Sequence, residues 1–419
     1  MRTIHDKPLH SSGVRDFFSK YPGFLPQQDT LLNCKWSQRW FSWLQASVEE
    51  DTYTFQEVLQ GRSGAEVMIN DMPFCMLSSY DYLGLIGHAD IEEAAIDAIR
   101  TYGTGTGGVR LLTGTNQLHE ELEKSISHFK GTEDAMVLSS GYMANLAVVA
   151  ALFSNKDLVI ADEYIHRSIA DAIKLAGITA VSFRHNDPDS LEQVLTSYSS
   201  TVRKLVIVEG VYSMDGDICR LPEIVRLKEI HGALLMIDEA HSLGVLGPQG
   251  RGVNAHFGIP AHQIDIFTGS LSKAIPSNGG YIAGREEDIV YLKHGGAPYM
   301  FSAAATPANT AAALAALRVM QEENWRFDTL WDNTHLLIAA LQEAGIRTGL
   351  SATPIIPVIC GDNESALHLS KKLFDEQILA TAVIYPAVPE GKARLRLCCT
   401  AAHTPELLHR FVHIIRRVR

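Results

Sequence analysis

Short apolar runs alternate with helical stretches between residues 130 and 285, and this alternation restricts the possible folds more than any other feature of the chain. Segments with helical periodicity separate most of the runs. Strands that alternate with helices form a mainly parallel sheet with helices on both faces. The sequence therefore predicts an α/β fold with a mainly parallel seven-stranded sheet. Its strands are expected at Ala135–Leu138, Leu158–Ile160, Ala180–Phe183, Leu205–Val208, Ala233–Ile237, Ile264–Phe267 and Tyr281–Ala283.

The segments on either side of this region predict two further parts. Residues 1–65 resemble an irregular arm with one amphipathic, aromatic-rich segment, and such an arm could pack on a partner subunit. Beyond residue 300 two helical stretches are followed by a smaller α+β region and a final helix from Thr404. We therefore expect an N-terminal arm (1–65), a large domain (66–335) and a small C-terminal domain (336–419) in this chain of 419 residues.

Charge and cysteine content limit the partners and the compartment. A net charge of -12 argues against nucleic acid and against anionic membranes, because both favour a positively charged surface, so a small metabolite is the expected ligand. The six cysteines are scattered without CxxC spacing, and the N-terminus carries no apolar signal segment. No stretch reaches the roughly 18 apolar residues of a membrane span. The sequence thus predicts a cytoplasmic protein with reduced thiols and no transmembrane segment.

Polar residues follow five of the predicted strands directly. In parallel sheets ligands bind beyond the carboxyl ends of the strands, so these residues are expected to share one edge. One such cluster could be an ordinary polar loop, whereas five clusters with complementary chemistry favour a single ligand site. The clusters are Ser139–Gly141, Asp162–His166, Glu209–Ser213, Asp238 with His241, and Ser270 with Lys273.

Asp238 and Lys273 are the pair that suggests a specific chemistry. Each follows a buried strand, so an acid and an amine stand at the same edge of the sheet. Pyridoxal 5'-phosphate (PLP) requires such a pair, because its aldehyde forms a Schiff base with lysine while a carboxylate keeps its ring nitrogen protonated. The alternative for an isolated pair is a solvated lysine and an aspartate that caps a helix.

The neighbouring clusters supply the other contacts that PLP needs. Ser140 and Gly141 precede a helix whose free N–H groups suit a phosphate, although the same residues could form a simple N-cap. His166 offers a flat ring for stacking on the pyridine, while an isolated histidine is more often structural. Four further residues complete this set: Ser270 for the phosphate, His241 and Ser213 for the phenolic oxygen, and Lys273 as the base that removes the substrate's α-proton.

Arg396 is a candidate for binding an amino-acid carboxylate. It alternates with Arg394 in a predicted strand, so both arginines point to one face, and a guanidinium can bind a carboxylate through two hydrogen bonds. An exposed edge strand with solvated arginines is an equally good interpretation of this pattern.

These residues lie in motifs that resemble the α-oxoamine synthases, which are fold-type-I PLP enzymes that join an amino acid to an acyl thioester with loss of carbon dioxide. The similarity runs from Ser79 to the C-terminus, with the motifs in family order. They read SSYDYLGL, YGTGTGGVRLLTGTNQLHEELE, SSGYMAN, FRHND, EGVYSMDGD, IDEAHSLGVLGPQGRG, GSLSKA and RLRLCCTAAHT.

The resemblance assigns roles residue by residue. It implies that Lys273 is the Schiff-base lysine, that Asp238 holds the ring nitrogen and that His166 is the stacking histidine. The remaining implied contacts are Gly141 and Tyr142 at the cofactor, His241 and Ser213 at the phenolate, Ser270 at the phosphate, Tyr82 and Arg396 at the substrate, and Ser302 as a weaker contact to a neighbouring subunit's phosphate. It further implies a homodimer with the active site at the interface, and an acyl group delivered by CoA or by an acyl-carrier protein.

Three departures from the family pattern bear on the substrate. Ile384 stands where 8-amino-7-oxononanoate synthase commonly has an arginine, and Ala387 stands where it has a threonine. Pro276 replaces the usual glycine three residues after Lys273, which stiffens that turn. The first two departures argue against the substrate pairing of that synthase. The sequence as a whole does not choose among serine, alanine and glycine as the amino acid.

Two other interpretations of the same residues remain open. An aminotransferase or lyase on this fold would use the same lysine and carboxylate, but would not release a thiol from an acyl thioester. A non-catalytic partner subunit or a PLP-sensing regulator is the other alternative. Lys273 argues against a non-catalytic subunit, and the lack of a basic N-terminal module argues against a regulator.

Overall fold

The computed structural model describes residues 13–27 and 31–419, and it divides the chain into two compact units. The sheet unit comprises Tyr80–Asp332 and Leu350–Pro354. The terminal unit comprises the described residues before Tyr80 together with Asn333–Gly349 and Ile355–Arg419. The division therefore falls at Tyr80 rather than at the predicted residue 66, and the predicted arm shares a compact unit with the C-terminal segment. The part of the N-terminus predicted to carry no signal segment, residues 1–12, lies outside the described residues.

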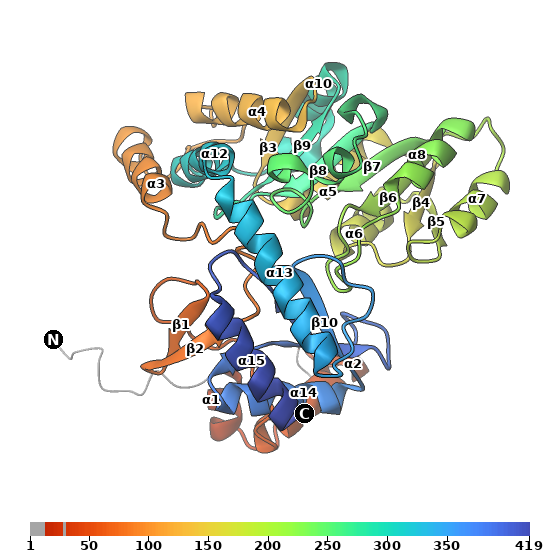
Figure 1. The fold of residues 1–419 in the computed structure, drawn as a ribbon. Helices are drawn as coiled ribbons and strands as arrows, with labels where there is room; N and C mark the ends of the chain where they lie inside the picture. The colour runs from red at the N-terminus through yellow and green to blue at the C-terminus, as the bar shows by residue number, and fades with distance from the viewer. Residues whose placement is uncertain (1–12, 28–30) are drawn as a thin grey trace. The chain divides into compact units, whose positions relative to one another are not determined.

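A seven-stranded sheet forms the centre of the sheet unit (Figure 1). All seven predicted strands are present in it, which confirms the α/β fold class. The strands are β3 (Asp134–Leu138), β4 (Leu158–Asp162), β5 (Thr179–Phe183), β6 (Lys204–Glu209), β7 (Leu234–Asp238), β8 (Ile266–Ser270) and β9 (Gly280–Gly284).

The strand order of this sheet is β3-β9-β8-β7-β6-β4-β5. Neighbouring strands from β8 to β5 pair in parallel, whereas β9 pairs antiparallel with both β8 and β3. The carboxyl ends of β4, β6, β7 and β8 therefore lie along one edge. In the β6–β7 register Glu209 stands opposite Asp238, so two carboxylates are neighbours there.

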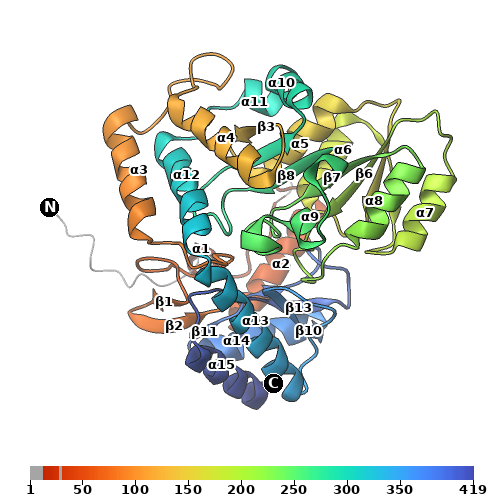
Figure 2. The same ribbon diagram turned by 45° about the horizontal axis from the view of Figure 1, so that its top comes forward.

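Helices cover the sheet (Figure 2), and six of its strands are buried on both faces, whereas the edge strand β5 is largely exposed. Strand residues such as Met136, Val159 and Met236 pack with α5 (Gly141–Leu152), α6 (Arg167–Ala176), α10 (Glu286–Gly295) and α11 (Ala297–Met300) in one apolar cluster. The alternating strand residues are buried as well. Other helices of the unit are α3 (Ala89–Tyr102), α4 (Gln117–Lys130), α7 (Pro188–Thr196), α8 (Leu221–Ile230), α9 (Val253–His256) and α12 (Pro307–Glu322), and α7 lies beside α8 in Figures 1 and 2.

The terminal unit is built on two three-stranded sheets. In the first, β2 (Met72–Met76) pairs with β1 (Glu66–Ile69) and, in parallel, with β11 (Ile378–Leu379). The second sheet has β13 (Ala393–Cys398) between β10 (Ile355–Gly361) and β12 (Ala382–Val383). Strand pairing thus joins residues near both ends of the chain.

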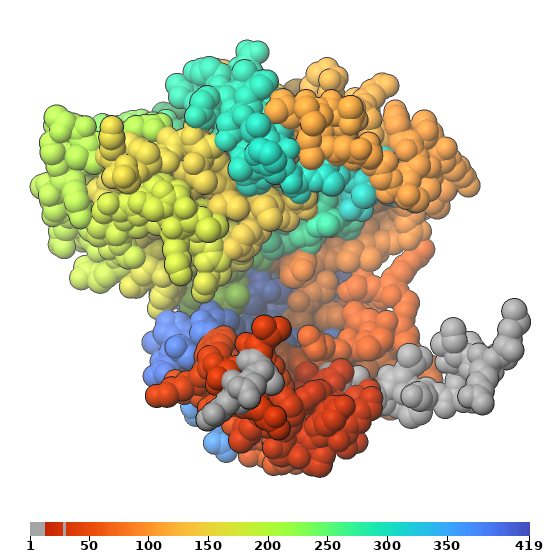
Figure 3. All heavy atoms as spheres, turned by 180° about the vertical axis from the view of Figure 1, so that it is seen from behind, coloured from red at the N-terminus to blue at the C-terminus, as the bar shows by residue number. Residues whose placement is uncertain are grey.

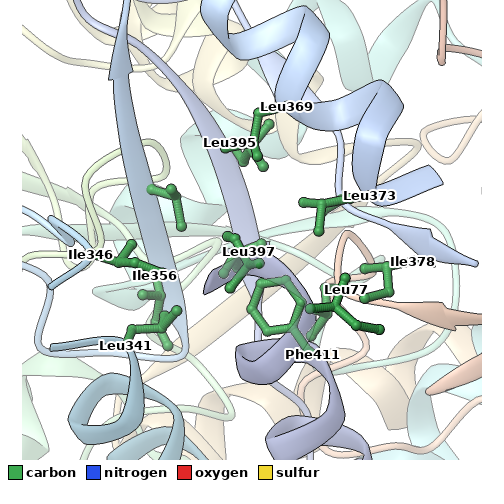
Figure 4. Packing of buried hydrophobic residues seen from close by; sticks show 14 of the residues in the cluster. Leu77, Leu341, Ile346, Ile356, Leu369, Leu373, Ile378, Leu395, Leu397 and Phe411 are labelled. Atoms are coloured by element: carbon green, nitrogen blue, oxygen red, sulfur yellow. The ribbon is translucent and has the colours of Figure 1, made fainter. Parts of the chain in front are cut away.

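The core of the terminal unit is apolar and is contributed by distant segments (Figure 4). Leu395 and Leu397 of β13 pack with Leu373 and Phe411, and Leu77 joins them from the N-terminal segment. The helices that contribute are α13 (Trp325–Glu343), which carries the chain from the sheet unit into this one, α14 (Asn363–Asp375) and α15 (Pro405–Val418). Thr404 caps α15, as the sequence predicts a helix from that residue.

The N-terminal arm contains two helices, one more than expected. They are α1 (Gly13–Lys20) and α2 (Lys35–Glu49), and their residues form part of the surface drawn in red in Figure 3. Phe17, Phe24 and Phe41 pack edge to face, and Trp36 remains 62% exposed. Among residues 13–27 and 31–419, no helix combines the length and the apolar character needed to cross a membrane.

Candidate active site

A small pocket of about 190 Å³ lies at the carboxyl ends of β6, β7 and β8. Eight of the predicted site residues line it, so the strand-end clusters do share one edge. It is smaller than the roughly 300–1,000 Å³ of pockets for drug-sized ligands. The lining residues are Ser140, Gly141, Tyr142, Asn145, His166, Glu209, Asp238, Ala240, His241, Ser270, Ser272 and Lys273.

The wall formed by the start of α5 depends on glycine. Ser140 is the N-cap, and its hydroxyl accepts a hydrogen bond from Met143 N at 3.2 Å. A Cβ added at Gly141 would lie 3.2 Å from both Gly269 O and Ser270 Cβ. The first turn of α5 therefore approaches the end of β8 closely. This places free helix N–H groups and the positive end of the helix dipole at the pocket, which suits an anionic group.

Asp238 is held by hydrogen bonds from two sides. Its Oδ2 accepts from Asn145 Nδ2 at 2.7 Å, and its Oδ1 accepts from Ala240 N at 2.9 Å. Asn145 is itself fixed, because its Oδ1 accepts from Thr268 Oγ1 at 2.6 Å. Asp238 is buried, with only 5% of its surface exposed, and these two donors orient its carboxylate as a hydrogen-bond acceptor.

His166 belongs to the same hydrogen-bond network. Its Nδ1 lies 2.7 Å from Ser168 Oγ, and that hydroxyl also accepts from Asn145 Nδ2 at 2.8 Å. Burial lowers the pKa of His166 below its ordinary value, and the charge of Lys273 acts in the same direction while Asp238 opposes it. At neutral pH the ring is therefore an uncharged imidazole that is held at Nδ1 and lines the pocket.

His241 is positioned by a residue far away in the chain. Tyr82 Oη lies 2.7 Å from His241 Nδ1, and both side chains are buried. Tyr82 is predicted as a substrate contact, but only 1% of its surface is exposed and its hydroxyl points to the histidine. The Tyr82 hydroxyl thus holds the His241 ring, and a contact between Tyr82 and substrate stays a prediction.

Lys273 follows β8 and lines the pocket. Its Nζ lies 5.9 Å from the centre of the Tyr80 ring, within the range of a cation–π contact. Ser270 and Ser272 bond through their hydroxyls at 2.8 Å and shape the turn that leads to the lysine. An amine and an oriented carboxylate therefore face one small cavity.

Among the other predicted residues, Ser213, Ser302 and Arg396 do not line the pocket, whereas Tyr142 does. Ser213 donates its N–H to Glu209 Oε2 at 3.3 Å, and Ser302 Oγ lies 3.4 Å from Ser139 Oγ. Tyr142 lines the pocket but is 38% exposed and donates to Asp171 Oδ2 at 2.6 Å. Arg396 belongs to β13 of the terminal unit, where its Nη1 donates to Cys398 Sγ at 3.2 Å. Their contacts with cofactor, substrate or a neighbouring subunit stay predictions.

Sequence reasoning assigned no function to three polar residues that line the pocket. Asn145 interrupts an otherwise apolar helical stretch one turn after Gly141, and this interruption was its signal. Glu209 ends a strand within one of the predicted clusters, and Ser272 directly precedes Lys273. Asn145, for example, joins a helix to the ends of two strands, and periodicity along one element does not reveal such contacts.

These residues fit PLP. A Schiff base needs a lysine amine, which Lys273 supplies. A protonated pyridine nitrogen needs a carboxylate that accepts its hydrogen bond, and Asn145 and Ala240 hold Asp238 in that orientation. The close approach at Gly141 leaves helix N–H groups for a phosphate. Glu209 also lines the pocket, and its buried Oε1 has no hydrogen-bond partner within the described residues, so the protein leaves one polar atom of this residue unsatisfied.

Comparisons of sequence agree with this chemistry. The family model for aminotransferases of class I and II matches residues 73–415. The chain is 43% identical over 350 residues to an 8-amino-7-oxononanoate synthase of Thermoanaerobacter pseudethanolicus, which covers 83% of this chain and 88% of the relative. It is 40% identical over 380 residues to 8-amino-7-oxononanoate synthase 1 of Bacillus velezensis, with 90% and 97% covered.

Solved structures with the same fold include serine palmitoyltransferases. The enzyme from S. paucimobilis with a bound PLP-myriocin aldimine superposes with a TM-score of 0.88 at 31% identity, covering 96% of this chain and 98% of that chain. The Sphingomonas wittichii enzyme gives a TM-score of 0.89 at 31% identity, with 93% and 98% covered. Fold, pocket and sequence lead to one assignment: the chain belongs to the class I and II aminotransferase family and, within it, to the PLP-dependent α-oxoamine synthases.

Proposed function

We propose that this chain condenses a small L-amino acid, either serine, alanine or glycine, with an acyl thioester in a PLP-dependent reaction that yields an α-aminoketone. The observation that carries the proposal is that Lys273 and a carboxylate oriented by Asn145, Asp238, line the same small pocket. Membership of the α-oxoamine synthases supports the decarboxylative condensation as the reaction type.

The reaction balances without an added oxidant or reductant. A bond forms between the amino acid's α-carbon and the thioester carbonyl carbon, and the carbon–sulfur bond breaks to release a free thiol. The bond between the α-carbon and its carboxylate breaks to release carbon dioxide. The α-carbon first loses a proton and later regains one. When bound, PLP supplies an electron sink for the electron pair left on that carbon.

Three residues of the pocket are assigned separate chemical roles in this reaction. We assign to Lys273 Nζ the covalent attachment of the cofactor and the removal of the α-proton, because it is the amine that lines the pocket. Asp238, fixed as an acceptor, keeps a proton on the pyridine nitrogen. His166 presents an uncharged ring, since burial lowers its pKa, and it can stack on the pyridine without repelling that proton.

The acyl substrate is proposed to end without a charged group. The product named for the sequence relatives, 8-amino-7-oxononanoate, keeps a carboxylate at the far end of its acyl chain. Ile384 stands where that synthase commonly has an arginine, and here it packs against the apolar core of the terminal unit. An isoleucine provides no cation for a terminal carboxylate. CoA and an acyl-carrier protein are both candidates for the thiol.

A homodimer is proposed as the working form. Leu112 is 77% exposed and Phe301 is 80% exposed, and a β-bridge between Val109 and Ala303 links the two segments that carry them. Large apolar side chains exposed near each other are typical of association surfaces. Ser302 directly follows Phe301, so a partner subunit bound at this surface would contact the Ser302 hydroxyl.

A cytoplasmic location is also proposed. The six cysteines are free thiols, which suits a reducing compartment.

The test uses purified protein supplied with PLP. We expect an absorbance band from lysine-bound cofactor that Lys273→Ala abolishes. Acyl thioester should then release free thiol only when serine, alanine or glycine is present, and Lys273→Ala should lower that rate by about 10²-fold or more. An uncharged acyl thioester should react faster than a thioester of a dicarboxylic acid.

The outcomes separate the alternatives. Absence of the lysine-dependent band would overturn the assignment of the pocket. A band with amino-acid turnover to an oxo acid, but no thiol release, would instead indicate an aminotransferase or lyase. A band with no turnover of either kind would indicate a non-catalytic partner subunit.

A further inference from the structure

Glu209 is a buried carboxyl group with very little hydrogen bonding. It ends β6, lines the pocket and is 3% exposed. Its Oε2 accepts a hydrogen bond from Ser213 N at 3.3 Å. Its Oε1 is fully buried and has no partner among the described residues. A carboxylate in such a place would carry a charge that the protein barely compensates.

Glu209 is also one of three carboxyl groups at this edge of the sheet, with Asp238 beside it in register on β7 and Asp162 at the end of β4. The other two are well compensated. Asp162 accepts hydrogen bonds from Tyr212 Oη at 2.8 Å and from two backbone amides, and it lies 3.0 Å from His185 Nδ1. Asp238 has Asn145 and the backbone amide of Ala240.

Neighbouring carboxyl groups in a buried site do not all ionise, and the least compensated one keeps its proton. Burial raises the pKa of Glu209 well above its ordinary value, the charges of Asp238 and Asp162 raise it further, and Lys273 opposes them. Burial and the two neighbouring carboxylates therefore favour the neutral acid form of Glu209. Its proton makes it a hydrogen-bond donor, which a carboxylate cannot be.

We propose that Glu209 is held as a neutral carboxylic acid and donates a hydrogen bond to an acceptor atom of the cofactor bound in this pocket. The inference rests on the proposed function, since it needs PLP to occupy the pocket. An O–H donor at the lining without a protein acceptor needs a partner from outside the protein, which is either a ligand or an ordered water. The same contact would keep the pocket's net negative charge low, so that Asp238 alone faces the ring nitrogen.

Two substitutions test this proposal. Glu209→Gln keeps an uncharged N–H donor of similar length, whereas Glu209→Met keeps the length but has no donor. We expect the PLP dissociation constant, measured by absorbance titration, to stay within about 3-fold of wild type for Glu209→Gln. For Glu209→Met it should rise roughly 3- to 10-fold. The pH dependence of the lysine-bound band should be the same in wild type and Gln.

An infrared measurement reports the proton directly. Wild type at neutral pH should show the carbonyl stretch of a protonated carboxylic acid, and Glu209→Gln should lose it. Without PLP, the thermal unfolding midpoints of Glu209→Gln and Glu209→Met should lie close together. A midpoint far lower for Glu209→Met than for Glu209→Gln would overturn the proposal, because Glu209 would then stabilise the fold rather than bind the ligand.

The remaining outcomes are equally decisive. If Glu209→Gln weakens PLP binding as much as Glu209→Met and shifts the pH dependence of the band, Glu209 is ionised and the proposal is wrong. If Glu209→Met binds PLP as tightly as wild type, no hydrogen bond from Glu209 to the cofactor exists. Either result leaves a lysine-dependent band in wild type and so leaves the proposed function intact. Absence of that band in wild type would overturn both.

Discussion

Asn145 Nδ2 donates a 2.7 Å hydrogen bond to Asp238 Oδ2, although the two residues are 93 positions apart in the chain. The amide comes from the second turn of α5 and the carboxylate from the end of β7. Because Asn145 Oδ1 accepts from Thr268, the amide cannot turn its oxygen toward Asp238 without losing that bond. The donor is therefore fixed in the orientation that keeps the carboxylate an acceptor.

Asn145→Asp should weaken PLP binding roughly 10- to 100-fold, because it replaces a donor to a charged group with a second carboxylate. The dissociation constant from an absorbance titration measures the effect. Asn324→Asp is the matched control, since Asn324 is exposed and directly precedes α13, where either residue caps a helix. Equal affinities for both variants and wild type would show that Asp238 needs no such partner.

Tyr82→Phe should act through His241. Loss of the hydroxyl removes the 2.7 Å contact with Nδ1 and should lower kcat/KM roughly 3- to 10-fold. The pH dependence of the lysine-bound absorbance band should shift even without amino acid, because His241 loses its orientation. A change that appears only in the KM for the amino acid would instead indicate that Tyr82 contacts the substrate. Tyr291→Phe, at a side chain 54% exposed, is the control.

Gly280→Ala should disturb the phosphate end of the pocket. A Cβ at Gly280 would overlap Ser140 O and Gly141 N, so the start of α5 must move. We expect a loss of about 1–3 kcal/mol in the free energy of unfolding, measured with denaturant, and weaker PLP binding. Gly105→Ala, where a Cβ would meet nothing within 4 Å, should unfold like wild type. Two equally stable variants would contradict the close approach.

His185→Gln should remove a pH-dependent contribution to stability. Burial alone would lower the pKa of His185, but hydrogen bonds and charges from Asp162 and Asp217 raise it to about 10, above its ordinary value of 6.5. A raised pKa stabilises the fold fully below pH 6.5, and this stabilisation is lost as the pH rises through 10.

The difference in unfolding free energy between wild type and His185→Gln should therefore shrink steadily over that range. Denaturant unfolding at several pH values measures it. His262→Gln, at an exposed residue, should stay within about 0.5 kcal/mol of wild type throughout. A difference that stays constant with pH would show that His185 is not charged in the fold.

Much of this protein could be predicted from the sequence because burial leaves a local pattern. Each strand of the sheet is a short apolar run, and Ser140, Asp238 and Lys273 directly follow runs of this kind. Parallel strands align their carboxyl ends, so the shared pocket followed from the alternation of strands and helices. The terminal unit was harder, because β11 and β12 are two residues each and leave little periodicity.

What the sequence by itself determined is the set of elements and the chemistry at their ends. Only the tertiary structure decided which side chains share hydrogen bonds: Asn145 with Asp238, Tyr82 with His241, and Glu209 left with an unpaired oxygen. It also decided that β9 lies antiparallel between β3 and β8, and that β2 pairs with β11 about 300 residues away. The physical reason is that periodicity records whether a residue is buried, whereas its partner depends on strand order and helix packing, which bring together residues far apart in the chain.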